Sequence, residues 1–213
     1  IAVIGMDCAI GKRTTSRIVM DACRDNGIKA EMIYTGQTGW MEGYPYGFIF
    51  DSTVNDFISG EIEHAIVQCD NALRPDVIFL EGQSALRNPS GPCGSEFLIS
   101  GEARGTILQH VPGRPYLDGA EYPAGRLPYI ESLIELIRIY GSETLGITLN
   151  AEGLTAAEIV DYQRKLEGKL GIPVVQPLLE GVDRLIPIIH EFLNNHPDPI
   201  PRKPGGYSDH PDY

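Results

Sequence analysis

The chain has no long apolar run and few cysteines. None of its 213 residues belongs to a stretch approaching the roughly 20 consecutive apolar residues that cross a bilayer. Its four cysteines, Cys8, Cys23, Cys69 and Cys93, stand far apart without a CxxC pair or a Cys/His cluster. This spacing excludes a disulfide framework and a structural zinc site. We therefore expect a cytoplasmic protein that does not contact a membrane.

Positive charge is also scarce. Lysine and arginine together number 17 against 29 aspartates and glutamates, so the formal net charge is −12. Proteins that bind nucleic acid concentrate basic residues, because phosphate contacts dominate that binding. We expect a small-molecule substrate, no nucleic acid, and a homo-oligomeric assembly.

What the sequence does contain is a regular alternation of strand and helix patterns. Strands are predicted at residues 1–4, 30–35, 76–81, 105–110, 144–149 and 174–177, and helices at 14–23, 54–72, 129–139, 156–170 and 182–193. Short strands alternating with amphipathic helices indicate βαβ units, a mainly parallel sheet and helices on both faces. We predict one three-layer αβα domain over residues 1–194. Residues 195–213, rich in proline and glycine, are predicted to be a tail.

The chain begins inside its first predicted strand, without an initiator methionine. A central parallel strand normally has chain before it. We expect further sequence upstream.

The stretch "GMDCAIGK", residues 5–12, follows the first predicted strand and precedes a helix. It has one residue more between its glycines than the phosphate-binding pattern GxxxxGK[ST], and Arg13 separates Lys12 from Thr14. Such a loop still directs backbone N–H groups and a helix N-terminus at an anion, and this predicts a P-loop NTPase-like fold. The predicted cofactor contacts are Gly5, Asp7, Cys8, Ala9, Ile10, Gly11, Lys12, Arg13, Thr14 and Thr15. Lys12 is also a candidate catalytic residue, and a hydroxyl of Thr14 or Thr15 is a candidate magnesium ligand.

Two further loops follow predicted strands, at the sheet edge where such folds bind ligands. In "YTGQTGW", Thr35, Gln37 and Thr38 are predicted to orient a polar substrate. In "DVIFLEGQSAL", Glu81 stands at the tip of a strand and is predicted to hold a metal ion or act in catalysis. Gln83 and Ser84 in the same loop are predicted substrate contacts.

Other polar residues are weaker candidates. Asp51 is a predicted metal ligand, and Asp56 and Glu63 share one predicted helix face, which makes Glu63 a candidate base. Arg114 follows a strand in a Pro-Gly turn and has the planar fork that suits a carboxylate or phosphate. His110 is a candidate acid or base.

The residues Gly5, Asp7, Gly11 and Lys12 resemble the GTDxxxGK loop of dethiobiotin synthetase and its P-loop relatives. The segments "TGQT", "DFISGEIE", "EGQSAL" and "LNAEGLT" more closely resemble a family associated with D-glutamate N-acetyltransferase. This resemblance implies a P-loop fold that follows a Rossmann-like N-terminal domain. It implies acetyl-CoA with its phosphates on the first loop, an arginine and the TGQT loop on the D-glutamate carboxylates, and Glu81 or Glu63 as the base.

Two alternatives remain open at this point. The dethiobiotin synthetase resemblance implies ATP and Mg²⁺, with Lys12, Thr14 and Glu81 handling the transferred phosphate charge. Asn150, which follows the strand "LGITLN", and the loop at residues 176–181 would then hold adenine. The second alternative is a nucleotide-binding protein without catalysis.

Overall fold

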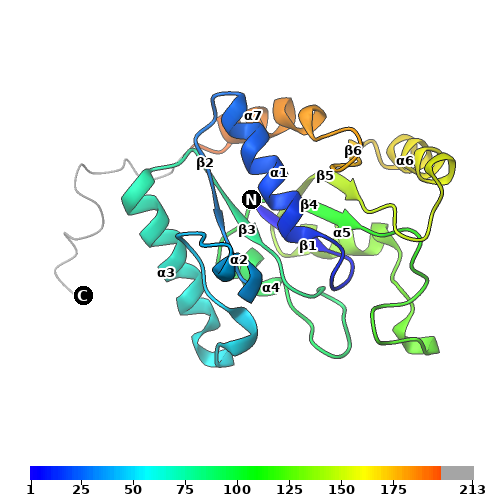
Figure 1. The fold of residues 1–213 in the computed structure, drawn as a ribbon, viewed down its shortest axis with the longest axis horizontal. Helices are drawn as coiled ribbons and strands as arrows, with labels where there is room; N and C mark the ends of the chain where they lie inside the picture. The colour runs from blue at the N-terminus through cyan, green and yellow to red at the C-terminus, as the bar shows by residue number, and fades with distance from the viewer. Residues whose placement is uncertain (198–213) are drawn as a thin grey trace.

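The structure, a computed structural model, describes residues 1–197 and contains one six-stranded parallel sheet with helices on both faces (Figure 1). The strands are β1 (Ala2–Gly5), β2 (Ala30–Ile33), β3 (Val77–Glu81), β4 (Gly105–His110), β5 (Glu143–Leu149) and β6 (Val174–Val175). The α-helices are α1 (Lys12–Asp25), α2 (Gln37–Met41), α3 (Asn55–Leu73), α4 (Ser95–Ile99), α5 (Ile130–Ile139), α6 (Ala156–Leu170) and α7 (Ile186–Asn195). Three 3₁₀ turns are η1 (Phe50–Ser52), η2 (Pro123–Gly125) and η3 (Asp183–Leu185).

Strand β1 lies inside the sheet, whose order is β2-β3-β1-β4-β5-β6. The chain leaves β1 toward β2 and β3 on one side and later continues to β4, β5 and β6 on the other. Ligands in open parallel sheets bind beyond the carboxyl ends of the strands at such a change of direction. The register places Val3 of β1 opposite Glu81 of β3, which brings the predicted acidic residue beside the first loop.

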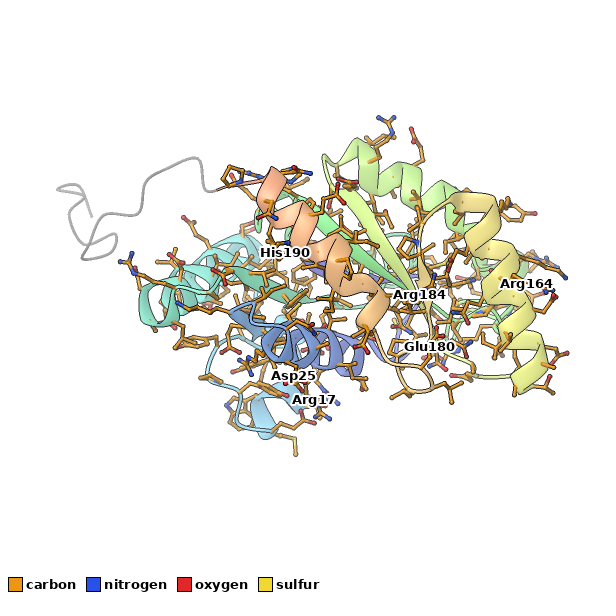
Figure 2. All side chains as sticks on the ribbon, turned by 90° about the horizontal axis from the view of Figure 1, so that it is seen from above. Arg17, Asp25, Arg164, Glu180, Arg184 and His190 are labelled. Carbon is orange, nitrogen blue, oxygen red and sulfur yellow. The ribbon has the colours of Figure 1, made fainter. Side chains whose placement is uncertain are left out.

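The two faces of the sheet carry two separate cores, because neighbouring residues of a strand point in opposite directions. On one face, Val3 packs with residues of α1 and α7, including Val19 and Ile189. On the other, Ile4 packs with α3, α5 and α6 through residues such as Ile62, Leu133 and Ile159. Figure 2 shows α1, labelled at Asp25, and α7, labelled at His190, crossing the same face.

Local sequence explains several helix ends. Helix α6 begins with a capping box in which Thr155 and Glu158 bond each other's backbone, and it ends at Gly171 with φ of 66°. The predicted helix at 182–193 starts instead as η3, and α7 follows with a proline in its first turn.

The predicted αβα fold with a parallel sheet is confirmed, and every predicted strand is found. The last one is shorter than predicted, because Pro177 has no N–H to donate to a neighbouring strand. The short helices α2 and α4 were not predicted. The predicted tail lies outside the described residues from residue 198 onward. Within residues 1–197, no helix combines the length and the apolar character needed to cross a bilayer.

Candidate functional site

A cleft of about 680 Å³ opens at the carboxyl ends of β1, β2 and β3. This volume is in the range of small-molecule sites. Its walls are the loop after β1, the start of α2, the turn η1 and the long loop after β3. The lining residues are Cys8, Ala9, Ile10, Gly11, Lys12, Arg13, Thr14, Gly36, Gln37, Thr38, Phe50, Asp51, Glu81, Gly82, Gln83, Ser84, Asn88, Ser90, Gly91, Pro92 and Cys93.

The loop after β1 exposes its backbone donors. Ala9 and Gly11 adopt positive φ angles of 51° and 99°, and these turn the chain sharply before α1 begins at Lys12. Within the described residues 1–197, the N–H groups of residues 9–14 donate to no protein acceptor. The first N–H groups of a helix have no intrahelical partner and carry its positive dipole end. This arrangement suits an anion.

Lys12 lines the cleft and is largely buried. Its Nζ donates to the main-chain oxygens of Asp7 at 2.7 Å and Ser84 at 2.9 Å. Burial lowers the pKa of Lys12, while Cys8, Asp7, Cys93 and Glu81 oppose that shift by their charge. An ammonium group has three donors, so one remains for a ligand.

Glu81 is buried at the end of β3 and joins the loops after β2 and β3. Its Oε2 accepts a hydrogen bond from the Thr35 N–H at 3.1 Å, and its main-chain oxygen accepts one from Thr35 Oγ1 at 2.6 Å. Gln83 Nε2 donates to Thr35 Oγ1 at 3.0 Å. Burial raises the pKa of Glu81 against the lowering effects of the Thr35 N–H, Arg13 and Lys12. A buried carboxyl group with a raised pKa in a cleft is suited to proton transfer.

The loop after β3 adds a contact that the sequence patterns did not reveal. Asn88, which is 5% exposed, donates from Nδ2 to Cys8 Sγ at 3.3 Å, and Ser84 Oγ lies 3.3 Å from the same sulfur. Cys93 lines the cleft nearby, and burial raises the pKa of its thiol to about 12. The segment "NPSGPCG" is rich in turn-forming residues, and that composition after a strand is the signal that marks it in the sequence.

The opposite flank of the first loop, toward β4 and β5, is held by side-chain bonds. Asp7 is fully buried, and its carboxylate accepts hydrogen bonds from Cys8 N at 2.8 Å, from Arg114 Nη1 at 2.9 Å and from Asp118 N at 3.0 Å. Arg114 also donates two hydrogen bonds of 2.9 and 2.8 Å to Glu152. These bonds raise the pKa of Arg114; burial opposes the shift and the bond to Asp7 adds to it. Arg114 does not line the cleft.

Two more predicted ligand contacts belong to this flank. Asn150 Nδ2 donates to the main-chain oxygen of Ile10 at 3.0 Å, and Thr15 Oγ1 donates to Gln109 Oε1 at 2.5 Å inside the core. We call Asp7, Thr15, Arg114 and Asn150 the locked side. Arg13, Thr14, Glu81 and Gln83, whose side chains lie along the cleft, form the open side.

The structure thus brings most predicted residues together and leaves some apart. Gln37, Thr38 and Asp51 are exposed residues of the cleft wall. Gly5 is buried beneath the loop, where a Cβ atom would lie 2.9 Å from Lys12 Cδ.

The remaining candidates lie elsewhere. Asp56 and Glu63 are exposed on α3 and do not line the cleft, so the structure gives Glu63 no contact with the predicted cofactor loop. His110 is buried outside the cleft with Nε2 at 2.8 Å from Tyr162 Oη. Within residues 1–197, no group of three or more His, Cys, Asp or Glu side chains is arranged to hold a metal ion.

Two curated relatives align with most of this chain. A D-glutamate N-acetyltransferase of Tritonibacter scottomollicae is 31% identical over 194 residues, with 86% of this chain and 55% of that protein covered. A D-glutamate N-acetyltransferase of a Pseudoalteromonas species is 27% identical over 195 residues, with the same coverage. The chain therefore spans about half the length of these curated relatives.

The crystal structure of a DUF1611 family protein from Anabaena variabilis has the same fold. It superposes with a TM-score of 0.80 at 24% identity, covering 89% of this chain and 56% of that one. Residues 1–186 match the family model described as "Domain of unknown function (DUF1611_C) P-loop domain". The chain belongs to this DUF1611 P-loop family.

Proposed function

We propose that this chain is the cofactor-binding part of an amino-acid N-acetyltransferase that takes acetyl-CoA and a D-glutamate-like substrate. The observation that carries the proposal is the row of unpaired N–H groups at residues 9–14 beside Lys12, which matches the charge of the cofactor's phosphates. The names of the relatives at 31% and 27% identity support the reaction class.

Acetyl-CoA supplies an activated acetyl group as a thioester. The protein must remove a proton from the substrate ammonium, because only the free amine has a lone pair for attack. Glu81 is the proposed base. Glu81 lines the cleft. Its Oε2 is held by the Thr35 N–H, while its Oε1 accepts no hydrogen bond from the described residues.

The substrate end of the cleft is proposed to lie near α2. Gln37 and Thr38 are exposed there and offer an amide and a hydroxyl, and Gln83 lines the same cleft. Arg114, the arginine predicted to meet a substrate carboxylate, is already bonded to Asp7 and Glu152. Substrate carboxylates would therefore be met by the polar groups of α2.

A phosphoryl-transfer reaction with ATP and Mg²⁺ is the second candidate, and one observation favours it. Thr14, Asp51 and Glu81, the three predicted magnesium ligands, all line the cleft. Hydroxyl and carboxylate oxygens are the ligands that magnesium prefers. Because Asn150 is bonded to Ile10, adenine contacts would depend on other residues.

Acetyl transfer is tested by following free thiol released from acetyl-CoA in the presence of D-glutamate. The assay uses the protein at its natural length, with the Tritonibacter scottomollicae enzyme as positive control. We expect thiol release that needs D-glutamate and no ATP. Release of ADP or phosphate from ATP would favour the second candidate. If neither activity is detected, the protein binds a nucleotide without catalysis. The preceding Rossmann-like domain and the homo-oligomer stay predictions.

A further inference from the structure

Arg13 occupies the position at which the P-loop pattern places its metal-binding hydroxyl. In GxxxxGK[ST], the residue directly after the lysine is a serine or threonine whose hydroxyl binds Mg²⁺. Here Lys12 is followed by Arg13. The hydroxyl of Thr14 comes one position later and lines the cleft, while that of Thr15 donates to Gln109 in the core and is not part of the cleft wall.

The side chain of Arg13 is available to a ligand. It lines the cleft, and its nearest carboxylate oxygen is Glu42 Oε1 at 3.8 Å, which is longer than a hydrogen bond. Arg114 shows the contrasting case, since four hydrogen bonds to Asp7, Cys8 and Glu152 engage its guanidinium. The guanidinium of Arg13 therefore keeps the forked donor set that binds phosphate in pairs of hydrogen bonds.

The oxygens left for a magnesium ion are few. Of the three predicted ligands, Thr14 offers one neutral hydroxyl. Glu81 already accepts the Thr35 N–H through Oε2, and Asp51 stands on the exposed turn η1. A divalent cation here would also lie near two fixed positive charges, Lys12 and Arg13, which lie next to each other at the start of α1. The donor set thus fits the magnesium site of a P-loop NTPase poorly.

We infer that the Arg13 guanidinium takes the place of the divalent cation, so that the cleft binds phosphate groups that carry no magnesium. This inference rests on the proposed function, because it assumes a phosphate on the loop of residues 9–14. It narrows the ligand class to phosphate esters that are bound without a metal, such as coenzyme A, and disfavours magnesium–nucleoside triphosphate complexes.

Arg17 provides a matched control. It lies one turn along α1, and its Nη1 is also 3.8 Å from Glu42, at Oε2. Unlike Arg13, it is exposed and does not line the cleft; Figure 2 labels it on α1.

The test is calorimetric titration of coenzyme A and of ATP into the wild-type chain, Arg13→Thr and Arg17→Thr, in EDTA and in excess MgCl₂. We expect wild-type protein to bind coenzyme A equally in both buffers. Arg13→Thr, which restores the consensus hydroxyl, should weaken coenzyme A binding about 10- to 100-fold, the loss of a charged hydrogen-bond pair. Arg17→Thr should bind as the wild type does. Arg13→Gln repeats the test if the threonine variant unfolds at a lower temperature.

The outcomes separate the two proposals. Coenzyme A binding that needs magnesium, or that survives Arg13→Thr unchanged, overturns the role of Arg13 and leaves the proposed function standing. An equal loss in Arg17→Thr also overturns it, since general charge near α1 would then be responsible. Binding of neither ligand to the wild-type chain overturns both.

Discussion

The two sides of the first loop differ in how completely their polar groups are paired. On the locked side, Asp7 accepts bonds from three residues, and Arg114 and Asn150 are bonded to neighbouring loops. On the open side, the side chains of Glu81 and Gln83 each make one hydrogen bond, both to Thr35. Arg13 lies 3.8 Å from its nearest carboxylate, and Thr14 makes no side-chain hydrogen bond within residues 1–197.

This difference assigns different tasks to residues of similar chemistry. A paired buried group holds the backbone in one shape, and removing it costs stability. An unpaired group beside a cleft is free to bind a ligand, and removing it costs affinity or rate. The locked side fixes the shape of the loop of residues 9–14, and the open side leaves that loop accessible to a ligand.

The largest expected effect on the open side comes from Glu81→Gln. If Glu81 removes the substrate proton, the variant should lose acetyl transfer about 10²- to 10⁴-fold in kcat, the usual contribution of a general base. The amide oxygen of glutamine can still accept the Thr35 N–H, so the fold should persist. Steady-state kinetics with D-glutamate and acetyl-CoA measure the change, and an unchanged kcat would remove Glu81 from the reaction.

The same substitution, Glu81→Gln, should raise the stability of the folded protein although it lowers activity. Because burial raises the pKa of Glu81 above 4.5, the folded protein holds that proton more tightly than the unfolded chain. The contribution of Glu81 to stability is therefore present at low pH and falls as pH rises through its folded pKa. Denaturant unfolding should show Glu81→Gln gaining stability relative to wild type between acidic and neutral pH. A parallel pH profile for both proteins would contradict this.

On the locked side, Asp7→Ala should cost about 3–5 kcal/mol of unfolding free energy, because it leaves part of a buried ion pair without its partner. Urea unfolding followed by circular dichroism measures the loss. The exposed pair of Glu135 and Arg138 on α5 serves as control, and its removal should cost much less, because solvent screens the two charges. Equal losses of unfolding free energy for the two pairs would contradict a structural role for the bonds of the locked side.

His110, which is buried, should make the stability of the protein depend on pH. Burial lowers its pKa to about 4 from 6.5, although the Glu131 charge opposes this shift. The folded protein therefore resists protonation, and its stability should fall as pH drops from 6.5 to 4, by on the order of 3 kcal/mol. His110→Gln should flatten that part of the pH profile in denaturant unfolding. A slope that survives the substitution would assign the pH dependence to other groups.

The smallest effect is expected at Asn88. Asn88→Ala removes the bond to Cys8 Sγ and the one that Asn88 Oδ1 accepts from Ser90 N, at a cost of roughly 0.5–1.5 kcal/mol per bond. Thermal unfolding should therefore show a small shift. A loss of unfolding free energy as large as that of Asp7→Ala would show that Asn88 has the same structural role as the residues of the locked side.

Short-range patterns predicted the parts of this molecule that depend on neighbouring residues. The strand before Gly5, the turn at Gly11 and the helix after Lys12 follow from apolar runs and spacing alone. Glu81 was predicted at a strand tip and lies in the cleft, because parallel strands end at one edge of the sheet.

Long-range pairing was not predictable in the same way. Arg114 meets Asp7 across 107 positions, and Thr15 meets Gln109 across 94, so nothing in either local segment marks these residues as structural. Helix α3 gives a second example. Its buried residues Ile58 and Ile62 turn one face to the sheet, and Glu63 falls on the solvent side, which the spacing of acidic residues did not reveal.

The central claim is that the backbone donors at residues 9–14 and Lys12 bind a phosphate group. The most direct test compares the affinity of the wild-type chain for coenzyme A and for pantetheine, the phosphate-free arm of the same cofactor, by calorimetric titration. The account predicts binding of coenzyme A at least about tenfold tighter than pantetheine, competition by inorganic pyrophosphate, and loss of this preference in Lys12→Met. Equal affinity for the two ligands would contradict it.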